Sequence, residues 1–217
     1  MDSALTGWSA WPAWLLAALV LARTFRSLHR HAASLDEQGR RVLVLATLAL
    51  AAMRWFNTAA LQGVMLHFLG ATIATLMFGA GTACWAMALV SLAGVLMGAA
   101  WQGWAMDFLA TGALPVMVTA LVSWAARTWL PRNIFAYVML NAFAAGALAM
   151  AASMLAKAAV VALLGGRALA AYLVATPMLM FAEAFFAGTV MALVVVYRPH
   201  WCRSFDDRDY LWPERRM

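Results

Sequence analysis

Long apolar runs, separated by short polar breaks, occupy almost the whole chain. A helix that crosses a lipid bilayer needs about 20 mostly apolar residues, and the runs show none of the period-two alternation of a membrane barrel strand. Seven helices are predicted, with apolar centres at Trp8–Ala22, Val42–Phe56, Val64–Phe78, Thr82–Ala99, Asp107–Ala126, Asn133–Leu164 and Leu169–Val196. The pattern therefore predicts an all-α fold, a polytopic transmembrane helical bundle of about seven spans. One transmembrane domain is expected over residues 1–200, with a polar tail over residues 201–217.

Composition supports the same fold class. Hydrophobic residues make up 66% of the 217 residues and charged residues only 11%, with a mean hydropathy of +0.82. A soluble domain is near half apolar and a quarter charged. This chain has too few polar residues to cover its apolar residues in water. We expect a multi-pass protein of the plasma (inner) membrane, with the lipid bilayer as its surroundings.

The basic residues predict the orientation of the chain. Twelve of the fifteen Lys and Arg residues fall in a loop over Arg23–Arg41, in a second loop with Arg127 and Arg132, and in the tail from Arg198. These segments lie on one side of the membrane only if the number of spans is odd. Because basic loops stay in the cytoplasm, the N-terminus is predicted outside and the tail inside. The net charge of +6 is explained by topology, so no nucleic-acid partner is expected.

Two polar residues are predicted near the outer face, and ionisable groups within a membrane are candidates for function. His67 stands near the outer start of the third predicted helix and Asp107 near that of the fifth. Together they could hold a divalent first-row metal. They could equally pair with each other, or with Arg54 at the outer end of the second helix.

Two further polar residues lie deep in the predicted helices. Glu183 is expected to accept hydrogen bonds from a neighbouring helix, to pair with Arg54 or Lys157, or to act as a ligand. Asn141 is expected to form a hydrogen bond between helices.

Small residues recur four apart on the first helix. Ala13 and Ala17 form one such pair, and Ala18 and Ala22 form another. Faces of this kind let another helix backbone approach closely, so they predict either packing within the chain or docking onto a partner membrane subunit.

Several short segments resemble one transporter family, and each is quoted as it stands here. They are Leu66-His67-Phe68-Leu69-Gly70-Ala71, Leu76-Met77-Phe78-Gly79, Asp107–Gly112 with Pro115, Glu183-Ala184-Phe185 with Gly188, Val196-Tyr197-Arg198-Pro199 and Phe205–Leu211. The chain from His67 onward resembles the CbiM/NikM family, the membrane substrate-capture subunits of energy-coupling factor transporters for cobalt and nickel. The tail is similar to that of a proteobacterial branch described as energy-coupling factor permeases.

The resemblance implies a seven-helix fold with its N-terminus outside, and a transport role in place of catalysis. It implies a transmembrane coupling subunit and ABC-type ATPases as partners, and a transported Co²⁺ or Ni²⁺ ion with no resident cofactor. In the family the terminal amine and a His after the initiator Met help to hold the metal, and His67 matches a further ligand. Here Asp2 replaces that His and Asp107 replaces the family's Asn. A site of His67, Asp107 and Asp2 is richer in oxygen, and would also admit Zn²⁺ or Mn²⁺.

Two other functions compete with metal capture. One is a structural or assembly subunit that binds no ion, which the Asp2 replacement favours. The other is an intramembrane enzyme that uses His67, Asp107 and Glu183 as acid and base groups. The sequence contains no HExxH, GxSxG or Walker A motif. The chain is therefore not expected to energise transport with ATP by itself.

Overall fold

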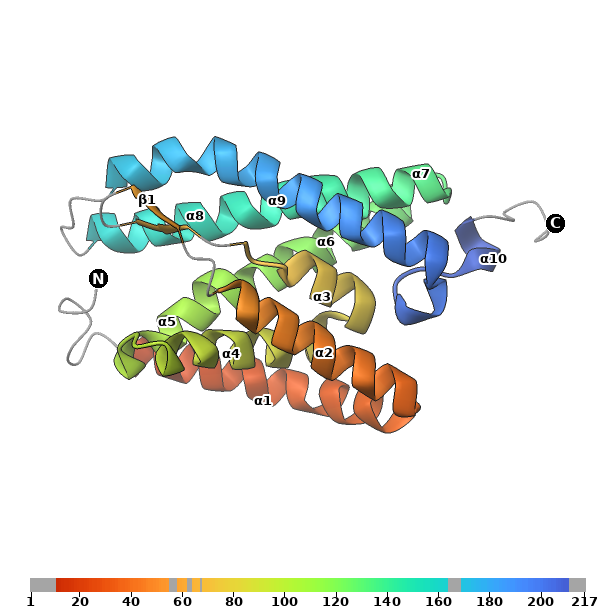
Figure 1. Ribbon diagram of the computed structural model, residues 1–217, viewed down its shortest axis with the longest axis horizontal. Coiled ribbons are helices and arrows are strands. Elements are labelled where there is room, and N and C mark those ends of the chain that lie inside the picture. Colours follow the sequence, from red (N-terminus) through yellow and green to blue (C-terminus); the bar gives the residue numbers. More distant parts are fainter. Residues whose placement is uncertain (1–10, 55–57, 62–63, 67, 164–168, 211–217) are drawn as a thin grey trace.

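The computed structural model describes residues 11–54, 58–61, 64–66, 68–163 and 169–210 of the chain, which form a bundle of roughly parallel and antiparallel helices (Figure 1). The elements are α1 (Trp11–Ser34), α2 (Glu37–Met53), β1 (Thr58–Leu61), β2 (Val64–Leu66), α3 (Ala71–Phe78), α4 (Ala80–Leu96), η2 (Trp101–Gly103), α5 (Trp104–Phe108), η3 (Leu109–Ala113), α6 (Leu114–Trp129), α7 (Ile134–Ala136), η4 (Tyr137–Ala144), α8 (Ala145–Leu163), α9 (Leu169–Tyr197), η5 (Pro199–Trp201) and α10 (Asp207–Tyr210). The prediction of a helical membrane bundle is confirmed.

Among the described residues, three continuous helices are long and apolar enough to cross a membrane. They run over Trp101–Trp129, Ile134–Leu163 and Leu169–Tyr197, and α4 is a shorter apolar helix. The sixth and seventh predicted helices agree with two of these within a residue. Asn133 sets the start of the sixth, because its side chain accepts a hydrogen bond from the backbone N–H of Ala136 and caps the helix. The number of spans and their orientation stay predictions.

The third predicted helix, Val64–Phe78, is wrong in its first half. Val64–Leu66 form strand β2, which pairs with β1 in an antiparallel hairpin, and the helix that follows has only the eight residues of α3. At 1.5 Å per residue α3 spans about 12 Å, too little to cross a bilayer. The chain is interrupted at Gly70, whose φ of 63° is a left-handed conformation that favours glycine.

The basic loop predicted over Arg23–Arg41 is also wrong, because most of it is helical. Helix α1 continues to Ser34 and α2 begins at Glu37, which leaves a turn of two residues. Between Arg23 and Ser34 the chain has neither proline nor glycine, so arginine and alanine side chains simply extend the helix into the polar region. The side chain of Asp36 caps α2 by accepting a hydrogen bond from the N–H of Gly39.

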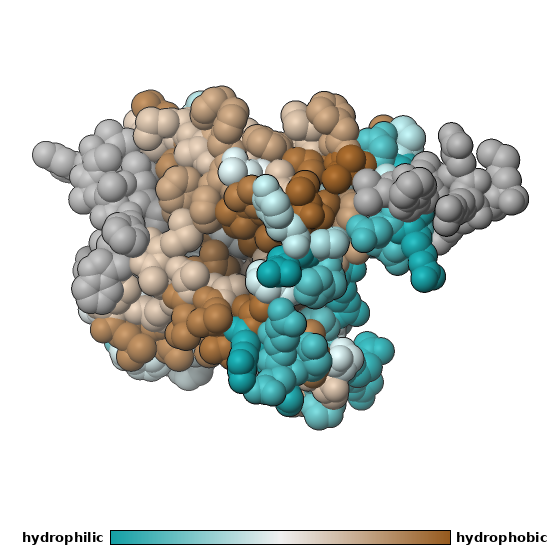
Figure 2. All heavy atoms as spheres, turned by 45° about the vertical axis from the view of Figure 1, so that its right-hand side comes forward, coloured by the Kyte–Doolittle hydropathy of each residue, from teal (hydrophilic) through white to brown (hydrophobic). Residues whose placement is uncertain are grey.

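All three basic segments gather at one end of the bundle. Arg132 pairs with Asp209 of the tail at 3.3 Å, and Arg127 and Arg203 line one cavity together. The turn between α1 and α2 and the tail line a second cavity, which Figure 2 shows as a notch between two polar surfaces. The gathering of the basic segments at one end is the charge asymmetry that the sequence predicts, although which end faces the cytoplasm stays a prediction.

The two alanine faces of α1 have different surroundings. Ala13 and Ala17 are buried in a cluster with Ala88, Ala105 and Phe108, so for this pair packing within the chain is the alternative that is observed. Ala18 and Ala22 lie on the exposed side of α1. That face remains a predicted surface for another membrane subunit.

Helix α3 lies at the centre of the described bundle. All eight of its residues are buried, and it contacts α2, α4, α6, α8 and α9. Its two ends therefore lie inside protein, and the backbone groups that a helix leaves unpaired at each end need partners there.

Candidate functional site

The carboxyl group of Glu183 supplies hydrogen-bond acceptors at the N-terminal end of α3. Its side chain is 0% exposed, and its carboxyl oxygens accept hydrogen bonds from the backbone N–H of Leu69 at 3.0 Å and of Gly70 at 2.9 Å. These two N–H groups directly precede α3, at the end where a helix dipole is positive. A carboxyl group from α9 thus fixes the segment that leads into the buried helix.

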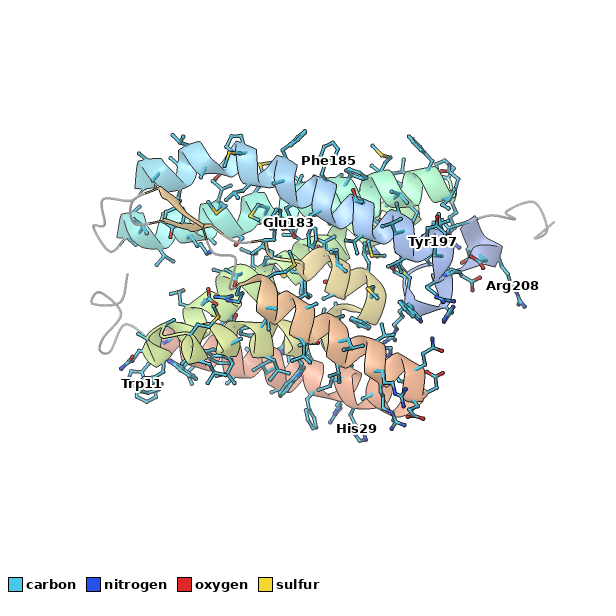
Figure 3. The ribbon with its side chains drawn as sticks, in the orientation of Figure 1. Trp11, His29, Glu183, Phe185, Tyr197 and Arg208 are labelled. Atoms are coloured by element: carbon cyan, nitrogen blue, oxygen red, sulfur yellow. The ribbon has the colours of Figure 1, made fainter. Side chains whose placement is uncertain are left out.

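The position of Glu183 explains why it points inward. It lies near the middle of α9 on the side that faces α3, whereas Phe185 lies on the outer side (Figure 3). Of the alternatives that the sequence left open, hydrogen bonding to a neighbouring helix is the one observed. Pairing of Glu183 with Arg54 or Lys157 is not observed: both carboxyl oxygens bind backbone N–H groups, and Arg54 has another anionic partner.

That partner is Asp107, which joins the end of α2 to α5. The Nη2 atom of Arg54 lies 2.9 Å from Oδ2 of Asp107, and both side chains are mostly buried. Gly94 makes room for the pair, since a Cβ there would lie 3.0 Å from the same Nη2 atom. Lys157 of α8 is close enough to interact electrostatically with both groups. Arg54 occupies the Oδ2 atom of Asp107, so a metal ion that binds this oxygen must displace the guanidinium group.

The pair predicts a measurable role for Asp107 in stability. Asp107→Asn leaves Arg54 without its anionic partner in a mostly buried site, so the free energy of unfolding should fall by about 1–3 kcal/mol. Thermal unfolding of the detergent-purified protein measures this change. Glu37→Gln is the matched control, because the exposed pair of Arg41 and Glu37 on α2 should contribute less than about 1 kcal/mol. Equal effects of the two variants would contradict the structural importance of the Arg54–Asp107 pair.

The structure places the other predicted site residues as follows. His67 and Asp2 lie outside the described residues, so the proposed meeting of His67, Asp107 and Asp2 stays a prediction. Within the described ranges, no group of three His, Cys, Asp or Glu side chains is arranged to hold a metal ion. Asn141 is buried in η4, and its Oδ1 atom has no hydrogen-bond partner among the described residues, so the expected bond through this oxygen is not observed.

The sequence did not predict which backbone N–H groups donate hydrogen bonds to Glu183. The N–H groups of Leu69 and Gly70 lie 114 and 113 positions away along the chain, so no local pattern connects them. Gly70 was the available signal, because a glycine inside an apolar run often marks an interruption of the helix.

Ionisable groups at the polar end have perturbed acidity. Burial lowers the pKa of His31, and the positive charge of Arg203 lowers it further. Burial raises the pKa of Tyr210, against the opposing effect of Arg127 and Arg132. Burial, together with the positive charge of Arg203, therefore disfavours protonation of His31 beside the tail.

Comparison with known proteins supplies a family for these features. A family model described as "cobalt uptake substrate-specific transmembrane region" matches residues 1–201. No curated protein and no solved structure matches the chain.

Proposed function

The chain belongs to the CbiM family of cobalt uptake substrate-specific transmembrane regions, and we propose that it captures Co²⁺ at the outer face of the membrane for an energy-coupling factor type transporter. The family match over residues 1–201 is the observation that carries this function, because it covers nearly all of the 217 residues. A member of this family is a multi-pass plasma-membrane protein and a substrate-binding component of cobalt uptake. Ni²⁺ is proposed as a second substrate, because an imidazole nitrogen such as that of His67 suits both ions.

The proposed ligands are His67, Asp2 and Asp107. An imidazole nitrogen suits Co²⁺ and Ni²⁺, and carboxylate oxygens complete the coordination. Support comes from the anchoring of Leu69 and Gly70 by Glu183, since His67 stands only two positions before Leu69 in the chain. A segment fixed in this way can hold a ligand with little loss of freedom on binding. In this proposal Asp107 binds the ion after separating from Arg54.

We also propose the partners of the chain. A transmembrane coupling subunit would dock on the exposed face of Ala18 and Ala22, where small side chains allow close approach. ABC-type ATPases would supply energy, because this sequence has no Walker A motif. An enzymatic role is not proposed: Asp107 pairs with Arg54 and Glu183 binds backbone N–H groups, so neither side chain is placed as a free acid or base.

Calorimetric titration of the purified full chain with Co²⁺ tests the function. One ion per chain is expected, and His67→Ala should weaken binding at least about tenfold. His29→Ala is the matched control, because His29 is exposed on α1 and points away from the bundle (Figure 3). Parallel titrations with Ni²⁺, Zn²⁺ and Mn²⁺ rank the substrates. If no divalent ion binds, metal capture is wrong, and an assembly subunit becomes the better hypothesis.

A further inference from the structure

The second end of α3 is held by the C-terminal tail, residues 198–210. The backbone N–H of Arg203 donates to the carbonyl of Met77 at 3.0 Å, and that of Ser204 donates to the carbonyl of Leu76 at 3.1 Å. The hydroxyl of Ser204 donates to the same Leu76 carbonyl at 2.8 Å, and the thiol of Cys202 lies 3.4 Å from it. The tail thus pairs helix carbonyls that lack partners within α3.

Tyr137 anchors this part of the tail from the other side. Its hydroxyl forms hydrogen bonds with the side chains of Cys202 and Ser204, and its ring packs edge-on against Phe205 and Tyr210. Cys202, Phe205 and Tyr210 are all buried. Tyr137 therefore orients the side chains of Cys202 and Ser204, which in turn contact α3.

The tail has room to move where it crosses α3. Cavities of about 360 Å³ and 200 Å³ are both lined by Arg203, the first toward α1 and α2 and the second toward α6. Arg203 itself is exposed, and its side chain lies over Gly79, where a Cβ would be 3.4 Å from it. The tail at Arg203 is therefore bordered by open space on both sides, whereas Cys202 and Phe205 stay packed in the core.

These contacts connect the polar end of the protein with the segment that precedes α3. A short, fully buried α-helix moves as one body, because its hydrogen bonds fix the rise per residue. The tail holds one end of α3 at Leu76 and Met77, and Glu183 holds the other at Leu69 and Gly70. If α3 moves as one body, movement at the tail would reach the backbone that Glu183 anchors.

We propose that Ser204 and Tyr137 are remote positioning residues for metal binding, which act through α3 on the segment after His67. The inference rests on the proposed function, since it assumes that His67 binds the ion. Loosening the tail should weaken metal binding without changing the ligands. A partner subunit that displaces the tail at the polar end would then lower metal affinity at the far end of α3.

The test compares Ser204→Ala and Tyr137→Phe with the wild-type full chain in detergent. Calorimetry should show Co²⁺ affinity weakened about tenfold, within the range of about 5- to 150-fold that is typical of coupled sites. The visible spectrum of bound Co²⁺ at saturation should be unchanged, because the coordinating atoms are unchanged. Ser204→Thr keeps the hydroxyl and should restore near wild-type affinity.

Asp209→Asn is the matched control, because it removes the tail's ion pair with Arg132 but no hydrogen bond to α3. Its Co²⁺ affinity should stay within about twofold of wild type. Equal weakening of Co²⁺ binding in Ser204→Ala, Tyr137→Phe and Asp209→Asn would indicate general loosening of the tail. That result would overturn the proposal. Unchanged affinity in both Ser204→Ala and Tyr137→Phe would overturn it as well.

Amide hydrogen exchange in metal-free protein separates this inference from the proposed function. The amides of Leu69 and Gly70 should exchange about tenfold faster in Ser204→Ala than in wild type, because the anchored backbone loosens. If the wild-type chain binds no Co²⁺, metal capture fails and exchange alone decides whether α3 couples its two ends. Unchanged exchange at both amides would overturn the coupling, whether or not metal binds.

Discussion

Glu183→Ala should lower the free energy of unfolding by about 3–5 kcal/mol, a larger effect than that of any other single polar substitution proposed above. The substitution leaves the N–H groups of Leu69 and Gly70 without acceptors in a buried site, at about 1–3 kcal/mol each, and adds a cavity. Water cannot readily replace the carboxyl group inside the bundle. Thermal or denaturant-induced unfolding in detergent, followed by tryptophan fluorescence, measures the loss.

Two further variants identify the cause of that loss. Glu183→Gln keeps the side-chain volume and one acceptor oxygen, so it should cost less, about 1–3 kcal/mol. Ser153→Ala is the matched control, because Ser153 of α8 is fully buried and its hydroxyl has no partner among the described residues. It should change stability by less than about 1 kcal/mol. If Glu183→Ala were no more destabilising than Ser153→Ala, the anchoring of α3 by Glu183 would be refuted.

The long helices were predictable because their limits are local. Asn133 caps one helix, and the glycines at 165 and 166 follow its apolar run, so both boundaries can be inferred from neighbouring residues. Helix α1 shows the opposite case. Arginine favours helix almost as strongly as alanine does, so the charges at Arg23–Arg30 indicate where the membrane ends and not where the helix ends.

The region before α3 could not be predicted in this way. Residues 64–78 are apolar almost throughout, and an apolar run without periodicity does not distinguish a strand from a buried helix. Only Gly70 indicated an interruption. The partners of Glu183 and of the tail lie more than 100 residues away, and such contacts depend on tertiary packing. Among the candidate ligands, the pairing of Asp107 with Arg54 was one of the alternatives that the sequence left open.

Gly70→Ala should be strongly disruptive, with a loss of about 2–5 kcal/mol in the free energy of unfolding. The φ of 63° at Gly70 costs about 1–2 kcal/mol for a residue with a Cβ. That Cβ would also lie 2.2 Å from Cδ2 of Leu50, a buried side chain of α2, and overpacking of this kind costs about 1–3 kcal/mol. Any backbone shift that relieves the contact also weakens the hydrogen bond from Gly70 to Glu183.

Gly98→Ala separates the conformational cost from the steric cost in the same unfolding measurement. Gly98 has a φ of 100°, but nothing lies within 4 Å of a Cβ placed there, so this variant should lose only the conformational part, about 1–2 kcal/mol. The double variant Gly70→Ala/Leu50→Ala removes the steric conflict, so its loss should be smaller than the sum of the two single losses. Equal losses for Gly70→Ala and Gly98→Ala would show that Leu50 gives way freely. The close packing of α2 on the start of α3 would then contribute nothing to holding the segment that Glu183 anchors.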